Sequence, residues 1–373
     1  MDATGRAVAL IDPDAIERNC RTLKQRVGGA TELCAVVKAN GYGHGAAVCA
    51  AAALRGGASR LAVAAASEAE ELRLHFPETP ILVMGALTEE ELRTALTAHA
   101  DVAVWREGFR RLCSAVAAEL GRPARVHLKL DSGMGRLGER DARRLIELAT
   151  ACVADDHLEI AGAWTHFATA DLPSDDFMDH QLAVFAPVAD AIRGLASGCT
   201  VHAANSAATL REPATHLDMV RCGIAIYGLD PFHRDPSEHG LEPALELRSY
   251  VADVKRFDAG ESAGYGRTWR APEETWVGVL PIGYGDGVRR GLSNNAEVLV
   301  GGRRYPLVGT ISMDNITIDL GRETDVEPGA PAVLIGRQGS DRILAEEVAA
   351  RLDTINYEVT CGISSRVPRQ VRQ

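Results

Sequence analysis

The chain lacks several features that would define its class at once. It has no apolar run of membrane-spanning length, and none of its eight cysteines forms a Cys-x-x-Cys pair. Its histidines and cysteines show no metal-type spacing, so no metal site is expected. The amino terminus has no long apolar segment behind a basic start, which argues against a signal peptide. Free thiols and a cytoplasmic location are therefore predicted.

Aromatic residues and basic charge are also scarce. Only 5% of the residues are aromatic, so alanine, valine, leucine and isoleucine must fill most of the core. The chain has 40 basic and 51 acidic residues, and its net charge of −11 argues against nucleic acid or an anionic membrane as the main partner. A small anionic ligand stays compatible, because a pocket can be locally basic. With 373 residues, the chain is long for one domain and suits two.

Short apolar runs alternate with amphipathic stretches from about residue 10 to residue 230. Each of the first seven runs precedes a helical pattern, such as the capping box Thr88-Glu89-Glu90-Glu91. Eight such units predict a (β/α)₈ barrel of the TIM type over residues 1–235. A doubly wound open sheet is the alternative, which the absence of Gly-x-Gly-x-x-Gly after the first strand weakens. The runs are Leu33–Val37, Leu61–Ala65, Ile81–Met84, Val102–Val104, Val126–Leu130, Ile160–Trp164, Val201–Ala204 and Leu217–Val220.

The character of the sequence changes near residue 230. The stretch 230–240 is rich in proline, aspartate and histidine, which is typical of a linker. Short β-type segments broken by glycine and proline follow it, with a late helix over Leu344–Leu352. Residues 236–373 are therefore predicted to form a mainly β domain, and residues 1–11, with the run Val8–Ile11, could pair with it.

Polar residues follow the predicted barrel strands at their carboxyl ends, where such barrels gather their reactive groups. Burial lowers the pKa of a lysine there and makes its amine nucleophilic toward an aldehyde, and an arginine can clamp a carboxylate with two hydrogen bonds. Any single residue of this kind is more often an ordinary loop residue. Five coincident strand ends favour a site, and they carry Lys38, Lys129, Asp131, Arg136, His166, Asn205, Ser206 and Arg221.

Two further groups of residues suit a site. Loops after the seventh and eighth strands commonly hold a phosphate, and here they carry Asn205, Ser206, Gly223 and Ile224. In the β domain, Tyr265 lies between two glycines, a setting that exposes its ring, although most tyrosines of this kind belong to ordinary hairpin turns. Tyr284 has the same setting.

Together these motifs resemble those of bacterial alanine racemases, a family of fold-type III pyridoxal phosphate enzymes. The family's cofactor-lysine motif is similar, nearly letter for letter, to AVVKANGYGHG around Lys38. Six more segments match in the family's order, from about Asp12 to the carboxyl terminus. They are LKLDSGMGRLG, the context of His166, MVRCGIAIYG, AGYGRTW, PIGYGDG and ISMD.

The resemblance implies a homodimer that interconverts L- and D-alanine with pyridoxal 5'-phosphate and supplies D-alanine for peptidoglycan. Lys38 would hold the cofactor and act as the base on the D-alanine face, and Tyr265 of the partner subunit would act on the L-alanine face. Arg221 would lie against the pyridine nitrogen with His166 near it, and Lys129 matches a position that is carbamylated in many members. The other implied cofactor contacts are Tyr42, Asn205, Ser206, Gly223, Ile224 and Tyr357, and the implied substrate contacts are Arg136, Met313, Asp314 and Tyr284.

Two alternatives share part of this pattern. A decarboxylase of the same fold type has the barrel and the lysine, but it carries a Cys-Glu-Ser segment that this chain lacks. A non-catalytic pyridoxal phosphate-binding protein lacks the β domain, whereas about 130 residues follow the linker here.

Overall fold

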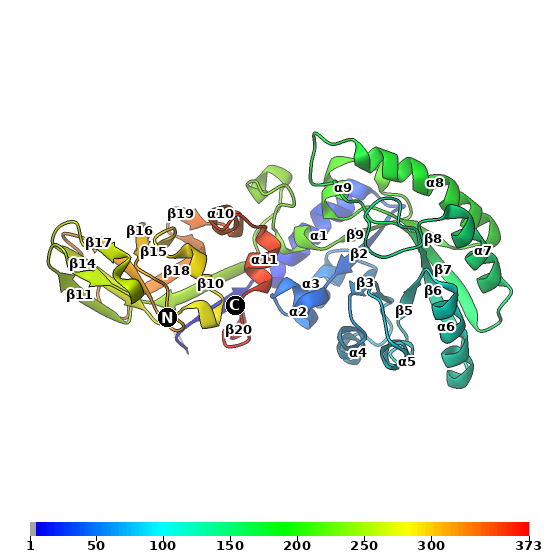
Figure 1. Ribbon diagram of the computed structural model, residues 1–373, viewed down its shortest axis with the longest axis horizontal. Helices are drawn as coiled ribbons and strands as arrows, with labels where there is room; N and C mark the ends of the chain where they lie inside the picture. Colours follow the sequence, from blue (N-terminus) through cyan, green and yellow to red (C-terminus); the bar gives the residue numbers. More distant parts are fainter. Residues whose placement is uncertain (1–4, 373) are drawn as a thin grey trace. The chain divides into compact units, whose positions relative to one another are not determined.

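Eight parallel strands close into a barrel in the computed structural model, which describes residues 5–372 (Figure 1). The last strand hydrogen-bonds to the first, so the predicted (β/α)₈ barrel is confirmed and an open doubly wound sheet is excluded. The strands are β2 (Glu32–Val36), β3 (Arg60–Val63), β4 (Ile81–Val83), β5 (Asp101–Val104), β6 (Ala124–Lys129), β7 (Leu158–Trp164), β8 (Thr200–His202) and β9 (Met219–Cys222).

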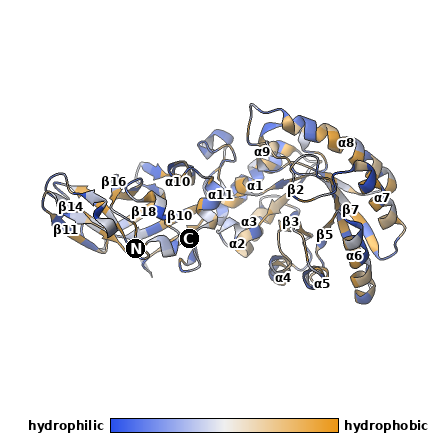
Figure 2. Cartoon of the chain, in the orientation of Figure 1, coloured by the Kyte–Doolittle hydropathy of each residue, from blue (hydrophilic) through white to orange (hydrophobic). Residues whose placement is uncertain are grey.

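One helix precedes the first barrel strand, the others follow barrel strands, and all lie outside the barrel (Figure 1). Figure 2 shows hydrophobic and hydrophilic residues along the same helices, as expected when one face of a helix packs on a sheet. Thr88 and Glu91 form the predicted capping box at the start of one of them. The helices are α1 (Pro13–Val27), α2 (Lys38–Tyr42), α3 (Ala46–Arg55), α4 (Ala66–His75), α5 (Glu89–Thr97), α6 (Glu107–Leu120), α7 (Ala142–Val153), α8 (Phe177–Leu195) and α9 (Ser206–Arg211).

Small side chains fill much of the barrel's core. Helix α3 buries Cys49, Ala50, Ala52 and Ala53, which are 0% exposed. Side chains this short allow the backbone of the helix to come close to the strands beneath it. The scarcity of aromatic residues is thus met by close approach of the elements rather than by large side chains.

The remaining strands form an antiparallel sheet in the order β11-β14-β17-β16-β15-β18-β10-β1, with β20 (Arg369–Val371) parallel to β1 (Val8–Ile11) at its edge. Its other members are β10 (Leu245–Tyr250), β11 (Asp253–Phe257), β14 (Thr275–Leu280), β15 (Glu297–Val300), β16 (Arg303–Val308), β17 (Ile316–Gly321) and β18 (Pro331–Gln338). A hairpin of β12 (Ser262–Ala263) and β13 (Trp269–Arg270), the short strand β19 (Asp341–Ile343) and helices α10 (Ala345–Arg351) and α11 (Asn356–Cys361) complete this part.

Backbone contacts divide the described chain into a barrel unit, residues 16–226 and 239–241, and a β unit, residues 5–15, 227–238 and 242–372. The strand β1 pairs with β10, which belongs to the β unit. Of the predicted domain ranges, residues 1–4 and 373 lie outside the described residues. Most of the predicted linker, residues 230–238 of 230–240, is grouped with the β strands, and the linker includes a short 3-10 helix over Pro236–His239.

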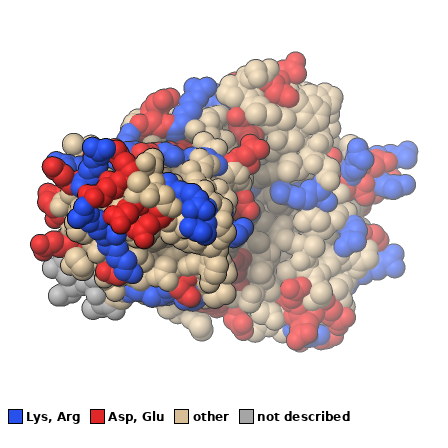
Figure 3. Space-filling model, turned by 60° about the vertical axis from the view of Figure 1, so that its left-hand side comes forward, with Lys and Arg blue, Asp and Glu red and all other residues tan. Residues whose placement is uncertain are grey.

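Charge and hydropathy add little beyond this architecture. Figure 3 shows acidic and basic side chains interspersed over the face that it draws. Within residues 5–372 no helix is long and apolar enough to cross a membrane. None of the eight cysteines takes part in a disulfide, and all but Cys361 are buried.

Candidate active site

The residues that follow the barrel strands meet at one end of the barrel, because all eight strands are parallel. Lys38 begins α2 just after β2, Lys129 is the last residue of β6, and Arg221 lies in β9. His166 follows β7, and its pKa is affected by the charges of the other three residues. The structure therefore brings these predicted residues together.

The chain directly after Lys38 adopts a left-handed turn. Ala39 and Asn40 have φ angles of 52° and 51°, Gly41 has 64° and Tyr42 has 51°. For a residue with a Cβ atom, this conformation costs roughly 1–2 kcal/mol. Three of the four residues after Lys38 are of this kind, so other interactions must hold the turn.

Side-chain oxygens supply these interactions. The carboxylate of Glu68 accepts a hydrogen bond from the backbone N–H of Ala39 at 2.6 Å. The side-chain oxygen of Asn40 accepts one from the backbone N–H of Ala46 at 2.8 Å and so ties the turn to the start of α3. The path of the backbone on leaving Lys38 is thus fixed from two neighbouring helices.

Tyr42, Gly223 and Ser206 form a close group beside this turn. A Cβ atom on Gly223 would lie 2.3 Å from the Tyr42 hydroxyl, so glycine is needed there. The Ser206 hydroxyl oxygen accepts hydrogen bonds from the backbone N–H groups of Gly223 at 3.0 Å and Ala225 at 3.3 Å. The Lys38 amine is 5.9 Å from the centre of the Tyr42 ring. One part of the site therefore contains the Lys38 amine, the Tyr42 phenol, the Ser206 hydroxyl and the backbone of Gly223.

The guanidinium of Arg221 is buried and held on several sides. It donates to the carbonyl oxygens of Thr165 and Ala203, each at 2.9 Å, and to Nδ1 of His202 at 2.9 Å. Nδ1 of His166 lies 3.2 Å from the same guanidinium. Burial lowers the pKa of Arg221 to about 10.

Lys129 is buried among cations. Its amine lies 4.0 Å from the centre of the Trp164 ring, and the Arg221 guanidinium lies 4.8 Å from that same ring. Burial, with the charges of Arg221, Arg136 and Lys38, lowers the pKa of Lys129 to about 7. An amine in this state is largely neutral just above neutral pH and can react as a nucleophile.

The electrostatics of the site suit an anion. Burial lowers the pKa of His166 well below its ordinary value, and the charges of Arg221, Arg136, Lys129 and Lys38 lower it further. His166 is therefore neutral, and the four charges that lower its pKa all come from cationic side chains. The Nε1 donor of Trp164 is buried without a hydrogen-bond partner in the described part of the chain. A ligand with phosphate or carboxylate groups would fit this donor set.

Three other predicted residues have different settings. Asn205 caps α9, where its side-chain oxygen accepts from the backbone N–H of Ala208 at 3.0 Å. Ile224 is 1% exposed and begins a short 3-10 helix after β9. Arg136 is exposed, and no hydrogen bond or ion pair of its side chain is found among residues 5–372. Their predicted ligand contacts stay predictions.

In the β unit, three predicted residues are exposed to an unusual degree for large apolar side chains. Tyr265 is 73% exposed, Met313 is 50% and Tyr284 is 44%. Gly264, with φ of 74°, precedes Tyr265 and forms a β-bridge with Thr310. Such a bridge fixes the backbone and leaves the tyrosine ring projecting.

Two predicted residues have other described roles or positions. Asp314 forms an ion pair with Arg366 at 2.6 Å, so its carboxylate is already paired within the β unit. Tyr357 lies in α11 of the same unit. The structure tests neither the substrate contact of Asp314 nor the cofactor contact of Tyr357.

Some residues around the site were missed from the sequence. Glu68 was not singled out, and Trp164 and His202 were assigned only to the predicted strands Ile160–Trp164 and Val201–Ala204. His202 is 0% exposed and Trp164 is 2%. A polar histidine within an apolar strand was the available signal, because such a residue needs a buried partner.

Comparison with known proteins agrees with this geometry over nearly the whole chain. The model of the alanine racemase N-terminal domain matches residues 11–231, and that of the C-terminal domain matches residues 244–371. The chain belongs to the alanine racemase family. The reaction of this family is the interconversion of L-alanine and D-alanine, an isomerase reaction, and the match over both domains assigns it to this chain.

Individual members of the family support the assignment. The alanine racemase of Symbiobacterium thermophilum is 42% identical over 97% of this chain and 96% of its own length. That of Geobacillus kaustophilus is 42% identical over 96% of this chain and 92% of its own. The crystal structure of the alanine racemase of Streptomyces lavendulae superimposes with a TM-score of 0.94 at 37% identity, covering 99% of this chain and 97% of that one.

Proposed function

We propose that the chain racemises alanine with pyridoxal 5'-phosphate held on Lys38, and that Lys38 and Tyr265 act as bases on opposite faces of the substrate. The observation that supports this most is the group of cations, Lys38, Lys129, Arg136 and Arg221, around the neutral His166 at the carboxyl end of the barrel. Alanine racemases are pyridoxal phosphate enzymes, and such a cofactor carries a phosphate for which this donor set is suited.

The residues beside Lys38 fit the phosphate end of the cofactor. Tyr42, Ser206, Gly223, Ile224 and Asn205 would hold that group, because hydroxyls and backbone N–H groups from loops after the last strands converge near the lysine. Tyr357 would add a further hydroxyl. Gly223 would leave room for this contact, since any larger residue would meet Tyr42.

When bound, the cofactor would withdraw electrons from the bond between the substrate Cα and its hydrogen. The Lys38 amine would then take the proton from D-alanine, and the Tyr265 phenolate would take it from L-alanine. In each direction the opposite base would return a proton to the other face. A tyrosine has an ordinary pKa of about 10, so a cationic surrounding would help it to act near neutral pH.

Two arginines would have distinct duties. Arg136, which is exposed, would clamp the substrate carboxylate with two parallel hydrogen bonds, with Met313, Asp314 and Tyr284 as further substrate contacts. Arg221 would lie against the ring nitrogen of the cofactor as a fixed cation. Arginine remains protonated in proteins, so it would donate a hydrogen bond there without transferring its proton.

We also infer a homodimer in which each site combines the barrel of one subunit with Tyr265 of the partner subunit. The exposure of Tyr265, Met313 and Tyr284 supports this, because large apolar groups gathered at a surface commonly mark an interface. The D-alanine product would serve peptidoglycan synthesis, and the enzyme would work in the cytoplasm.

The test is chemical labelling combined with an activity assay. The protein is supplied with pyridoxal phosphate and L-alanine, and D-alanine is measured with an enzyme specific for it. Borohydride reduction followed by peptide mass spectrometry should then find the reduced cofactor on Lys38, and Lys38→Ala should remove both the label and the activity. Label on another lysine, or release of carbon dioxide from labelled alanine in place of D-alanine, would contradict the proposal.

A further inference from the structure

A line of hydrogen bonds runs from Arg221 through the interior of the barrel to Asp101. Arg221 Nη1 is 2.9 Å from Nδ1 of His202, and Nε2 of His202 is 2.9 Å from Nδ1 of His127. Nε2 of His127 is 3.1 Å from a carboxylate oxygen of Asp101. The four side chains come from β9, β8, β6 and β5, and all are buried. We call this set the Asp101 relay.

The chemistry of the end groups fixes where every proton lies. An arginine can only donate, so Nδ1 of His202 must be an unprotonated acceptor. His202 therefore carries its proton on Nε2 and donates it to Nδ1 of His127. His127 must then carry its own proton on Nε2, where it donates to Asp101. No other arrangement of protons satisfies all three bonds, so both imidazoles are neutral and all donors point toward Asp101.

The relay places a negative charge opposite the buried Arg221. Burial raises the pKa of Asp101, but the hydrogen bond from His127 and the charges of Arg125 and Arg60 outweigh this effect, and the pKa lies below its ordinary value. Asp101 is therefore ionised at neutral pH. Two neutral rings separate it from the guanidinium, and the cation and anion at the two ends reinforce every hydrogen bond between them.

The surroundings exclude water from the middle of the relay. The Trp164 ring stacks on the His202 ring at 5.7 Å with 10° between the planes. Gly162 leaves the space that His127 occupies, because a Cβ atom there would lie 2.3 Å from His127 Nδ1. This close approach coincides with an irregular register between β6 and β7 at His127. The strands are thus shaped around the two histidines.

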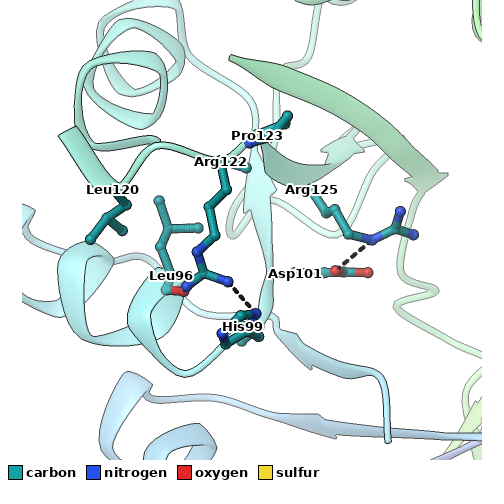
Figure 4. A pocket seen from close by; sticks show the side chains of 9 residues that line it. Leu96, His99, Asp101, Leu120, Arg122, Pro123 and Arg125 are labelled. Carbon is teal, nitrogen blue, oxygen red and sulfur yellow. Dashed lines mark hydrogen bonds and ion pairs between the residues drawn. The ribbon is translucent and has the colours of Figure 1, made fainter. Parts of the chain in front are cut away.

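The far end of the relay borders a small cavity of about 70 Å³ near the start of β5 (Figure 4). Figure 4 shows the guanidinium of Arg125 turned to Asp101, and the atoms are 3.1 Å apart. Arg122, on the other side of the cavity, contacts His99, whereas Arg60 forms a further ion pair with the Asp101 carboxylate at 3.8 Å. Asp101 therefore holds a cation on its outer side and the relay on its inner side.

We propose that Asp101, His127 and His202 are positioning residues that hold Arg221 as an oriented cation for the racemase site, with Asp101 as its buried counter-charge. The proton positions follow from the barrel alone. The effect on turnover rests on the role proposed above for Arg221, so the two parts can fail separately.

The proton positions are measured by nitrogen NMR on the full-length protein labelled with ¹⁵N-histidine, with and without pyridoxal phosphate. The spectrum distinguishes protonated from unprotonated ring nitrogens, and the variants His127→Gln and His202→Gln assign the signals. His127 and His202 should each show an unprotonated Nδ1 and a protonated Nε2. A protonated Nδ1 at His202 in the wild-type protein would overturn the relay, whatever the activity.

Substitution of Asp101 tests its part in the relay. Asp101→Leu removes the acceptor for Nε2 of His127, so the His127 proton should move to Nδ1 and point to Nε2 of His202. His202 must then carry its own proton on Nδ1, where it faces the N–H donor of Arg221. Asp101→Asn keeps an acceptor oxygen and loses the charge, so the proton positions should stay. A purely structural role for Asp101 would leave the His202 signals unchanged in both variants, and that result would overturn its part. If Asp101→Leu does not fold, the wild-type spectrum still decides.

Turnover provides the second measurement. In Asp101→Leu the kcat should fall by about tenfold or more, which is the size expected for a lost hydrogen bond to a charged group. The kcat of Asp101→Asn should fall less. The KM for alanine should change little in either variant, because Asp101 is not among the proposed substrate contacts. Glu159→Gln changes an exposed acid of β7 that also pairs with Arg125; it is the matched control and should keep both constants. If the His202 proton moves to Nδ1 in Asp101→Leu while the kcat stays unchanged, the role proposed for Arg221 is refuted, but the relay is not.

Discussion

The carboxylate of Glu68 accepts a hydrogen bond from the backbone N–H of Ala39, 2.6 Å away, and so ties the residue after Lys38 to the first turn of α4. The same carboxylate accepts from the backbone N–H groups of Ala64 and Ala65, at 2.9 and 3.1 Å. One side chain thus serves both the start of a helix and a strained turn. The position of Lys38 depends on this link, because the left-handed turn has little intrinsic stability.

Glu68→Ala should therefore destabilise the turn that follows Lys38. Loss of a charged acceptor from several backbone donors costs about 1–3 kcal/mol, and we expect slower and weaker attachment of pyridoxal phosphate. Urea unfolding and cofactor titration measure the two effects. Glu68→Gln keeps one acceptor oxygen, so its stability and cofactor binding should lie between those of the wild type and those of Glu68→Ala. Glu70→Ala, an exposed residue of the same helix, is the control, and equal effects from both alanine variants would refute the link.

Tyr265→Ala should separate the two directions of the reaction. Removal of a positioned base typically costs 10²–10⁴-fold, so proton removal from L-alanine should fall by about this factor, and removal from D-alanine by far less. Exchange of the α-hydrogen in deuterated water, followed for each enantiomer, measures this. Tyr250→Phe, a half-buried tyrosine of β10, serves as control. Equal losses for the two enantiomers would contradict the assignment of one base to each face.

The barrel could be predicted from the sequence because strands buried on both faces appear as continuous apolar runs. Val102–Val104 and Ile81–Met84 are such runs, and both became strands. Among the short β-type segments of the second domain, residues 245–254 read as one continuous segment, but the structure differs. Val251 bonds to Ala330 and Ala252 to Val279, so the chain changes partner there and the run forms two strands. Apolar character alone does not reveal a change of partner.

The site was partly predictable for a related reason. Lys38, His166 and Arg221 were found because each follows or ends an apolar run, and parallel strands bring such ends together. Glu68 and Asp101 were not found, because their partners Ala39 and His127 lie 29 and 26 residues away. A hydrogen bond between distant segments leaves no periodic mark in a sequence. It becomes visible only when the strands are assembled.

Lys129 should make stability depend on pH between about 7 and its ordinary value of 10.5. Its pKa in the folded protein is about 7, so in this range the unfolded chain binds the additional proton. The contribution of this group to the free energy of unfolding therefore increases by up to a few kcal/mol as the pH rises from about 7 to 10.5. The same contribution decreases again as the pH falls toward 7. Unfolding of the wild type and of Lys129→Met in buffers free of carbon dioxide measures the difference.

The same neutral amine should react with carbon dioxide. We expect a carbamate signal in the carbon NMR spectrum when labelled bicarbonate is added, and its amount should increase as pH rises through 7. Lys129→Met should lack the signal. The exposed Lys255, which forms an ion pair with Asp253, is the comparison residue and should not form the carbamate. A signal that persists in Lys129→Met would place the reaction at another lysine.

Gly223→Ala should weaken binding of pyridoxal phosphate without unfolding the barrel. The added methyl group would lie 2.3 Å from the Tyr42 hydroxyl oxygen and 2.8 Å from the adjoining ring carbon. Tyr42 is buried and held in the left-handed turn, so its ring has little space to move away from the added methyl group. Overpacking of this kind costs about 1–3 kcal/mol, which corresponds to roughly tenfold or more in affinity.

Titration of cofactor-free protein with pyridoxal phosphate, followed by fluorescence, measures this affinity. Gly194→Ala in α8 is the matched control, because its methyl group would meet no heavy atom within 4 Å, and its affinity should equal that of the wild type. Circular dichroism checks that both variants are folded. If Gly223→Ala bound the cofactor as tightly as Gly194→Ala does, Tyr42 and Gly223 would not belong to the cofactor site. The phosphate would then have to be held by other donors near Lys38.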